Sequence, residues 1–151
     1  ILQDLPDVSA FVAGLGTGGT LMGVGRRLKE ASDTVKIVAV EPEPGDLVQG
    51  LRSLEEGFIP PILDLSVLDG KYLVKSTDAL AMTRQLLVRE GIFGGISSGA
   101  VLHGALRLGR RIRSGSIVAL LADGGWKYLS SGIWTRPLSE AKKTMGGKIW
   151  W

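Results

Sequence analysis

A glycine-rich turn between a strand-like segment and a helix-like segment constrains this chain more than any other feature. The turn runs Gly14-Leu-Gly-Thr-Gly-Gly-Thr20, directly after the apolar segment 9–13. Apolar residues then follow at the spacing of an amphipathic helix, namely Leu21, Met22, Val24 and Leu28. Such a junction gathers unpaired backbone N–H groups at the positive end of a helix dipole. The sequence therefore predicts a phosphate-binding site at residues 14–20.

The order of the expected elements indicates an α/β fold with a mainly parallel sheet flanked by helices. Strands are predicted at about residues 9–14, 36–40, 71–74 and 117–121, and helices at about 19–31, 76–90 and 98–113. Ser76 or Thr77 would cap the second helix, Gly91 would close it, and Ser139 would cap a last helix. Residues 42–61 read as a long surface loop with room for a short helix. Apolar strands that alternate with helices are typical of a parallel sheet covered on both faces.

Composition excludes several classes of function. The 151 residues include no cysteine and one histidine, so we predict no disulfide and no metal site. No apolar run approaches the roughly 20 residues that span a bilayer, and we expect a cytoplasmic protein without membrane contact. The arginines that gather at 107–113 lack interleaved aromatic residues, which favours a solvated helix face over nucleic-acid binding. The chain begins at Ile1, and its first residues resemble the end of a helix, so we expect a piece of a longer protein.

A dinucleotide-binding fold is one alternative for the turn. Three of its glycines match the G-x-G-x-x-G motif, namely Gly14, Gly16 and Gly19. Glu41 follows the next predicted strand, at about the distance expected for the acid that binds a cofactor ribose. However, Pro42-Glu-Pro44 stands where a second crossover helix would be expected. Thr17 and Thr20 add hydroxyl donors that suit a terminal phosphate dianion better than a pyrophosphate. An NAD(P)-binding oxidoreductase domain stays open as an alternative.

A serine hydrolase is a second alternative, because Gly95-Ile-Ser-Ser-Gly99 fits the G-x-S-x-G motif. A catalytic triad would need an acid and then a histidine after Ser97. The single histidine, His103, lies six residues further along the same predicted helix, a rotation of about 600° that turns it to another face. Asp123 follows His103, which is the wrong order. We therefore expect His103 to be a structural residue.

Five short motifs in a fixed order give a more specific interpretation. They are Gly16-Thr-Gly-Gly-Thr20, Val38-Ala-Val-Glu-Pro42, Glu90-Gly-Ile92, Gly95-Ile-Ser-Ser-Gly-Ala100 and Tyr128-Leu-Ser130. Together they resemble the cofactor-binding large domain of the cysteine synthase family, pyridoxal phosphate enzymes of fold type II, the class of the tryptophan synthase β subunit. The resemblance covers nearly the whole chain but only the C-terminal half of such an enzyme. It implies a pyridoxal phosphate cofactor, a homodimer, and a division into a cofactor-binding domain at 1–136 and a C-terminal helix with an aromatic tail at 137–151.

The resemblance also assigns roles to the cofactor-binding residues. The family's phosphate cup corresponds to Gly16, Thr17, Gly18, Gly19 and Thr20. Ser97 corresponds to the partner of the pyridine nitrogen. A neutral hydroxyl there leaves this nitrogen largely unprotonated, which favours β-elimination and β-replacement over transamination. Serine is also a favoured N-cap, so Ser97 is alternatively a structural helix cap.

One arginine points to a branch of the family. Arg52 is similar to the arginine with which O-phosphoserine sulfhydrylases hold the substrate phosphate, and a planar guanidinium suits that group. The alternative is an exposed loop arginine. The segment Ala122–Ser130 and the aromatic end Trp150-Trp151 also resemble actinobacterial O-phosphoserine sulfhydrylases. This branch implies cysteine synthesis from O-phosphoserine, with O-acetylserine as the other substrate class, and either sulfide or a thiocarboxylated carrier protein as the sulfur donor. Two alternatives stay open for the C-terminal tail. It inserts into the active site, or its two tryptophans pack on the surface or at a dimer contact.

The catalytic lysine of the family belongs to the half that this sequence lacks. No lysine of this chain lies in a matching context, so we assign no catalytic residue and expect residues 1–151 to be inactive alone. A non-catalytic module built on the same fold is the remaining alternative.

Overall fold

Four parallel strands form the centre of the computed structural model, which describes residues 1–57 and 59–145. They are β1 (Ala10–Gly14), β2 (Lys36–Pro42), β3 (Gly70–Val74) and β4 (Ile117–Ala119). The strand order in the sheet is β3-β2-β1-β4. β1 pairs with β2 from Ala10↔Lys36 to Gly14↔Val40, and all pairings in the sheet are parallel. The predicted α/β class with a parallel sheet is therefore confirmed.

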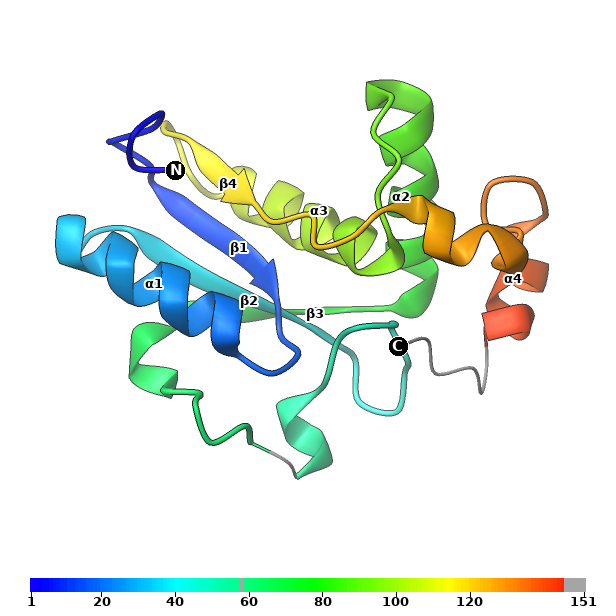
Figure 1. Cartoon of the computed structure of the whole chain (residues 1–151), viewed down its shortest axis with the longest axis horizontal. Helices are drawn as coiled ribbons and strands as arrows, with labels where there is room; N and C mark the ends of the chain where they lie inside the picture. Colours follow the sequence, from blue (N-terminus) through cyan, green and yellow to red (C-terminus); the bar gives the residue numbers. More distant parts are fainter. Residues whose placement is uncertain (58, 146–151) are drawn as a thin grey trace.

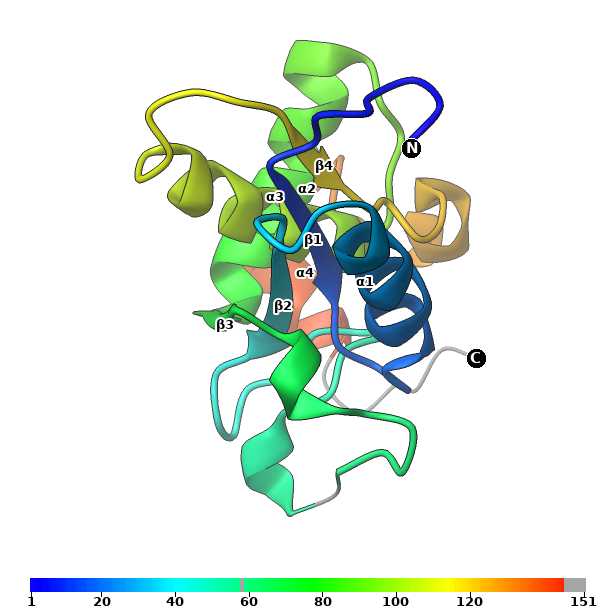
Figure 2. The same ribbon diagram turned by 90° about the vertical axis from the view of Figure 1, so that its left-hand side faces the viewer.

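Helices cover both faces of this sheet. α1 (Gly19–Ala31) lies on one face, and α2 (Ser76–Glu90) and α3 (Ile96–Gly109) lie on the other (Figure 1). A view turned by 90° separates α1 from the α2–α3 layer, with β1 and β2 between them (Figure 2). α4 (Leu138–Met145) contacts α2 and the 3₁₀ segment η3 (Gly125–Ser131). None of the described helices is long and apolar enough to cross a membrane.

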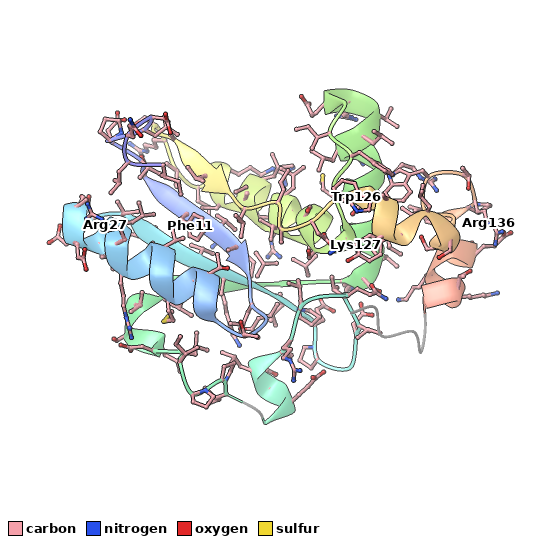
Figure 3. The ribbon with its side chains drawn as sticks, viewed as in Figure 1. Phe11, Arg27, Trp126, Lys127 and Arg136 are labelled. Atoms are coloured by element: carbon pink, nitrogen blue, oxygen red, sulfur yellow. The ribbon has the colours of Figure 1, made fainter. Side chains whose placement is uncertain are left out.

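The two faces of the sheet bury two separate apolar clusters, because alternate residues of a strand point to opposite sides. On the α1 side, β1 and β2 contribute Phe11, Ala13, Ile37 and Ala39. On the α2–α3 side, they contribute Val12, Val38 and Val40. Figure 3 shows Phe11 under α1, whereas Arg27 extends from the outer surface of that helix. The sequence shows continuous apolar runs rather than an apolar–polar alternation here, because both strands are buried on both sides.

α2 and α3 approach each other so closely that one position between them must be glycine. A Cβ atom at Gly99 would collide with the side chain of Thr83 and the carbonyl oxygen of Ala79. Thr83 is fully buried there, and its hydroxyl donates to the Ala79 carbonyl at 2.9 Å. This contact fixes the start of α3 against α2, which positions the first turn of α3.

Several boundaries differ from the sequence expectations. α2 begins at Ser76, and its N-cap is Lys75 rather than Ser76 or Thr77, because the Asp46 carboxylate accepts the Ser76 N–H. α3 begins at Ile96 rather than 98, and it ends at Gly109 rather than 113. β4 ends at Ala119, after which Leu120 donates once more to β1 and the chain leaves the sheet. Gly91 closes α2 in the left-handed conformation, as predicted.

The remaining differences lie at the two ends and in the long loop. Residues 1–5 form one hydrogen-bonded turn rather than a helix. The loop from 43 to 69 contains two short 3₁₀ segments, η1 (Leu54–Glu56) and η2 (Leu65–Val67). Ser139 lies inside α4, which begins one residue earlier, directly after Pro137. The aromatic tail with Trp150 and Trp151 lies outside the described residues.

Two of the arginines expected on a helix face, one in α3 and one just after it, lie against the edge strand β3. The guanidinium groups of Arg107 and Arg111 lie 4.8 and 5.6 Å from the centre of the Tyr72 ring. Arg107 also donates to the Leu73 carbonyl at 3.2 Å. These contacts give the two arginines a structural role on β3.

Candidate functional site

Three segments that are distant in the sequence meet at the carboxyl ends of the strands, and they enclose a cavity of about 570 Å³. The glycine-rich turn follows β1 and the loop 47–52 follows β2, so both lie at the same end of the sheet (Figure 1). α3 runs antiparallel to the strands and brings its first turn to this end as well. Ligands of open parallel sheets bind at this edge, where the strand order reverses. The order reverses here between β1 and β4, and residues following both strands line the cavity.

The glycine-rich turn presents a row of backbone donors to the cavity. Gly18 is the N-cap of α1 and has a φ of 86°, a left-handed conformation that disfavours any residue with a side chain. Among the described residues, no acceptor pairs with the N–H groups of residues 16–21. The side chains of Thr17 and Thr20 line the same cavity. Free N–H groups at the start of a 13-residue helix bind anions.

The loop 47–52 forms a wall of the cavity and touches both other segments. Gly50 has a φ of 84°, and its carbonyl oxygen lies 3.1 Å from the point that a Cβ atom of Gly16 would occupy. A Cβ atom on Gly50 would lie 3.9 Å from the hydroxyl oxygen of Ser97. The Arg52 N–H donates to the Leu15 carbonyl at 2.7 Å, which attaches the loop to the turn. The exposed Arg52 side chain lines the cavity from this loop.

Ser97 lies in the first turn of α3 and lines the cavity. Its helix is preceded by Gly95 as N-cap, so the interpretation of Ser97 as a helix cap is wrong. The residue is 7% exposed, and its hydroxyl has no hydrogen-bond partner among the described residues. Because Ser97 lines the cavity, its hydroxyl is available to a ligand atom there.

Asp123 and Tyr128 hold the start of α3. The Gly95 N–H donates to the Asp123 carbonyl at 2.9 Å, and the Tyr128 hydroxyl donates to the Asp123 carboxylate at 2.8 Å. Burial, together with the hydrogen bond to Asp123 and its negative charge, raises the pKa of Tyr128. The phenol therefore stays protonated and keeps donating at neutral pH. In Figure 3, Trp126 and Lys127 lie in this segment at the beginning of η3.

The structure separates Glu41 from the cavity, and the role of a ribose-binding acid is wrong. Glu41 is fully buried and is not among the residues that line the cavity. Its carboxylate accepts the Leu54 N–H at 3.1 Å and lies 3.5 Å from the Lys71 ammonium group. The strand order alone does not separate the two interpretations, because dinucleotide-binding folds share it. The burial of Glu41 does separate them, because a fully buried carboxylate cannot contact a ribose in the cavity.

His103 also lies outside the cavity, as expected from its position on α3. It is partly buried and stands six residues after Ser97 on the same helix, so no triad forms. The expected structural role of this histidine agrees with its position.

Sequence reasoning missed the wall that joins the predicted residues. Leu47, Val48, Gln49, Gly50 and Leu51 line the cavity between the turn and Ser97. The only signal was Gly50, a glycine inside a loop, since a positive φ requires glycine there. Glu56, Val101, Leu120 and Ala122 complete the lining and were not predicted either.

Comparison with known proteins places this chain in a family. The family model described as "Pyridoxal-phosphate dependent enzyme" matches residues 1–123. Cysteine synthase B of Salmonella typhimurium is 40% identical over 126 residues, which cover 83% of this chain and 42% of the relative. Cysteine synthase of Staphylococcus aureus is 38% identical over 136 residues, covering 85% of this chain and 44% of the relative.

Solved structures give the same result. A cysteine synthase from Entamoeba histolytica superimposes with a TM-score of 0.80 at 28% identity, covering 94% of this chain and 46% of that chain. An O-acetylserine dependent cystathionine β-synthase from Helicobacter pylori has a TM-score of 0.79 at 34% identity, covering 89% and 46%. The chain thus spans less than half the length of these relatives. It belongs to the pyridoxal-phosphate dependent enzymes of fold type II, the group that includes the cysteine synthases.

Proposed function

We propose that this chain supplies the cofactor-phosphate and ring-nitrogen contacts of a pyridoxal phosphate site at which cysteine is made from O-phosphoserine by β-replacement. The observation that carries the proposal is the single cavity into which the glycine-rich turn, Ser97 and Arg52 all open. The family membership supports the cofactor. The placement of an arginine beside the phosphate-binding turn favours a phosphorylated substrate.

The residues of the turn fit the cofactor phosphate. The unpaired N–H groups of residues 16–21 and the hydroxyls of Thr17 and Thr20 are all donors, and a phosphate monoester accepts through several oxygens. No side chain larger than threonine projects from residues 16–20, so a ligand can approach the backbone. We propose Gly16, Thr17, Gly18, Gly19 and Thr20 as this phosphate cup.

Ser97 is our proposed partner of the cofactor's ring nitrogen. Its hydroxyl is the polar group that α3 offers to the cavity, and it can donate to a neutral pyridine nitrogen. Apolar residues surround it in the lining, namely Val48, Leu51, Val101 and Leu120. Bound pyridoxal phosphate would supply an electron sink for reactions at the amino-acid substrate. A neutral partner for the ring nitrogen moderates that sink and favours elimination over transamination.

Arg52 is our proposed contact for the substrate phosphate. Its backbone N–H is bonded to Leu15, so its side chain starts beside the cofactor cup. A guanidinium group can bind two phosphate oxygens at once. Glu56 also lines the cavity and partly offsets the positive charge. The arrangement therefore suits a second anion of limited charge, the substrate phosphate, next to the cofactor phosphate.

The chain by itself is proposed to be inactive. No lysine is present among the described residues that line the cavity, and the family needs one to hold the cofactor and to move the substrate proton. We further propose a cytoplasmic homodimer, sulfide or a thiocarboxylated carrier protein as the sulfur donor, and residues 1–136 as the cofactor-binding unit with 137–151 appended to it.

Titration of the 151-residue chain with pyridoxal phosphate, followed by tryptophan fluorescence, tests the cofactor site. We expect saturable binding that Gly18→Ala and Ser97→Ala weaken, and no comparable binding of NADH. Saturable binding of NADH with none of pyridoxal phosphate would refute the proposed cofactor. Turnover of O-phosphoserine and sulfide by residues 1–151 alone would refute the proposed inactivity.

The longest natural form of the polypeptide tests the substrate. We expect Arg52→Ala to lower kcat/KM for O-phosphoserine about 10- to 100-fold, because a hydrogen bond between charged groups is lost, and to leave O-acetylserine little changed. Arg27→Ala is the matched control, because Arg27 is an exposed arginine on the outer surface of α1 (Figure 3). An equal loss with both substrates, or activity with O-acetylserine only, would overturn the assignment of Arg52. Absence of turnover and of any visible cofactor band would favour a non-catalytic module.

A further inference from the structure

The carboxylate of Asp46 joins three parts of the fold at the back of the cavity wall. One oxygen, Oδ2, accepts the N–H of Ser76 at the start of α2, at 2.6 Å. The other, Oδ1, accepts the N–H of Leu47 at 3.0 Å and lies 3.7 Å from the Lys142 ammonium group on α4. The Asp46 side chain is 23% exposed, so these contacts replace most of its water.

The loop 47–52 is held at its far end by a second carboxylate. Glu41 accepts the N–H of Leu54, and the N–H of Arg52 donates to Leu15. Asp46 is the corresponding attachment at the near end. The segment between these two attachments lines the cavity continuously.

A small space separates this wall from α4. It has a volume of about 60 Å³ and is lined by Asp46, Leu47, Gln49, Ser76, Leu80, Ile96 and Lys142. Leu47 and Gln49 line both this space and the large cavity. At these two residues the wall is therefore a single residue thick. A movement of Leu47 or Gln49 toward α4 would change the shape of the large cavity.

Electrostatics keep Asp46 charged in this position. Partial burial raises its pKa, but the hydrogen bonds from Ser76 and Leu47 and the charge of Lys142 outweigh burial. The pKa of Asp46 consequently lies below its ordinary value of 3.8. At neutral pH the carboxylate is ionised, which strengthens both hydrogen bonds from backbone N–H groups.

We propose that Asp46 is a positioning residue that holds the cavity wall 47–52 against α2. Through its ion pair with Lys142, it also makes the mobility of this wall depend on the helix α4. Asp46 does not touch the cavity ligand; it acts through Leu47 and the residues that follow. The inference rests on the proposed function for the identity of the ligand, pyridoxal phosphate, but not for the state of the wall.

Amide hydrogen exchange of residues 47–52 in the 151-residue chain is the primary test. Asp46→Ala removes two hydrogen bonds to a charged acceptor, and we expect exchange in this segment to accelerate about 10-fold or more. Lys142→Met removes only the partly exposed ion pair, and we expect about a 2- to 5-fold acceleration. The dissociation constant for pyridoxal phosphate should increase in the same order.

Asp69→Asn is the matched control. Asp69 accepts the N–H of Ile37 at 2.9 Å and lies 2.8 and 3.2 Å from the ammonium groups of Lys29 and Lys36. It thus repeats the chemistry of Asp46 at the opposite end of β2. If this variant accelerates amide exchange, we expect residues 47–52 to accelerate no more than the residues of the sheet.

The outcomes separate the inference from the proposed function. Unchanged exchange at 47–52 in Asp46→Ala, or an equal acceleration throughout the sheet, would overturn the role of Asp46. If Asp46→Ala does not fold, Asp46→Asn and Lys142→Met decide, because each keeps part of the contact. If the unmodified chain binds no pyridoxal phosphate, the proposed function fails, while the exchange measurement still decides the role of Asp46.

Discussion

Substitution of Gly18 by alanine provides a quantitative test of the turn. Gly18 is the N-cap of α1 with a φ of 86°, and a Cβ atom there would lie 3.3 Å from the Leu63 side chain. Gly23 lies on the same helix, where a Cβ atom would meet nothing within 4 Å. The two variants therefore compare a glycine at the N-cap with one inside the same helix. Of the two, Gly18 has the left-handed backbone conformation.

The expected changes in the free energy of unfolding have opposite signs. A left-handed conformation costs an alanine roughly 1–2 kcal/mol, so Gly18→Ala should destabilise the chain by about that amount. Gly23→Ala should stabilise it by about 0.5–1 kcal/mol, because alanine loses less backbone entropy in a helix. The two variants should thus differ by roughly 1.5–3 kcal/mol.

Equilibrium unfolding in urea, followed by tryptophan fluorescence, measures both variants. For an m-value of about 2 kcal/mol/M, the midpoints should lie roughly 0.8–1.5 M apart, with Gly18→Ala the lower. Gly18→Ala should also weaken pyridoxal phosphate binding, because the strain moves the N–H groups of the turn. A Gly18→Ala chain as stable as Gly23→Ala would refute the backbone argument.

Three further outcomes are expected. Gly99→Ala should destabilise the chain by about 1–3 kcal/mol in urea, because the added methyl must push α3 away from Ala79 and Thr83; a neutral result would contradict the close helix contact. Burial opposes ionisation of Asp69, but hydrogen bonds from Lys29, Ile37 and Lys36 outweigh it and hold the pKa of Asp69 below 3.8. The stability advantage over Asp69→Asn should therefore be complete above about pH 5 and shrink as the pH falls below 3.8, which unfolding curves at several pH values would detect. Glu56→Gln removes a negative charge from the cavity lining and should tighten pyridoxal phosphate binding about two- to five-fold at low ionic strength, with no gain at about 1 M salt.

The sequence predicts the regular parts of this fold well, since they depend on local patterns. Four apolar strands, the turn before α1 and the glycine that ends α2 follow from periodicity and from the conformations open to glycine. The cap of α2 does not follow from local patterns, because the N–H of Ser76 donates to the carboxylate of Asp46, which lies 30 residues earlier in the sequence. Likewise, glycine rather than serine precedes α3, since a Cβ atom at position 95 would collide with the Asp123 carboxylate and the Tyr128 ring.

The candidate site shows the same limit. The turn and Ser97 each carry a recognisable motif, but their common cavity depends on the path of the loop 47–52. That path is set by contacts distant in the sequence, namely Arg52 to Leu15 and Leu54 to Glu41. Glu41 illustrates the difficulty: its distance along the chain suits a ribose contact, whereas Lys71 on the neighbouring strand binds it inside the protein.

Among its described residues, the crossover from β2 to β3 contains two 3₁₀ segments and no α-helix, and it carries the proposed substrate contact. Among the described residues of the range 43–69, Val48, Leu51 and Val67 are the buried members of the apolar clusters, and Leu54, Leu63 and Leu68 pack against one cluster from the side. Exposed side chains of this crossover can change at little cost to the sheet, whereas the contacts of Asp46, Arg52 and Leu54 fix the path of its backbone. The Arg52 side chain is exposed, whereas Gly18 and Ser97 lie at the starts of helices. Under the proposed assignment, exchange of the substrate contact would leave the cofactor contacts in place, so the same fold could serve several substrates.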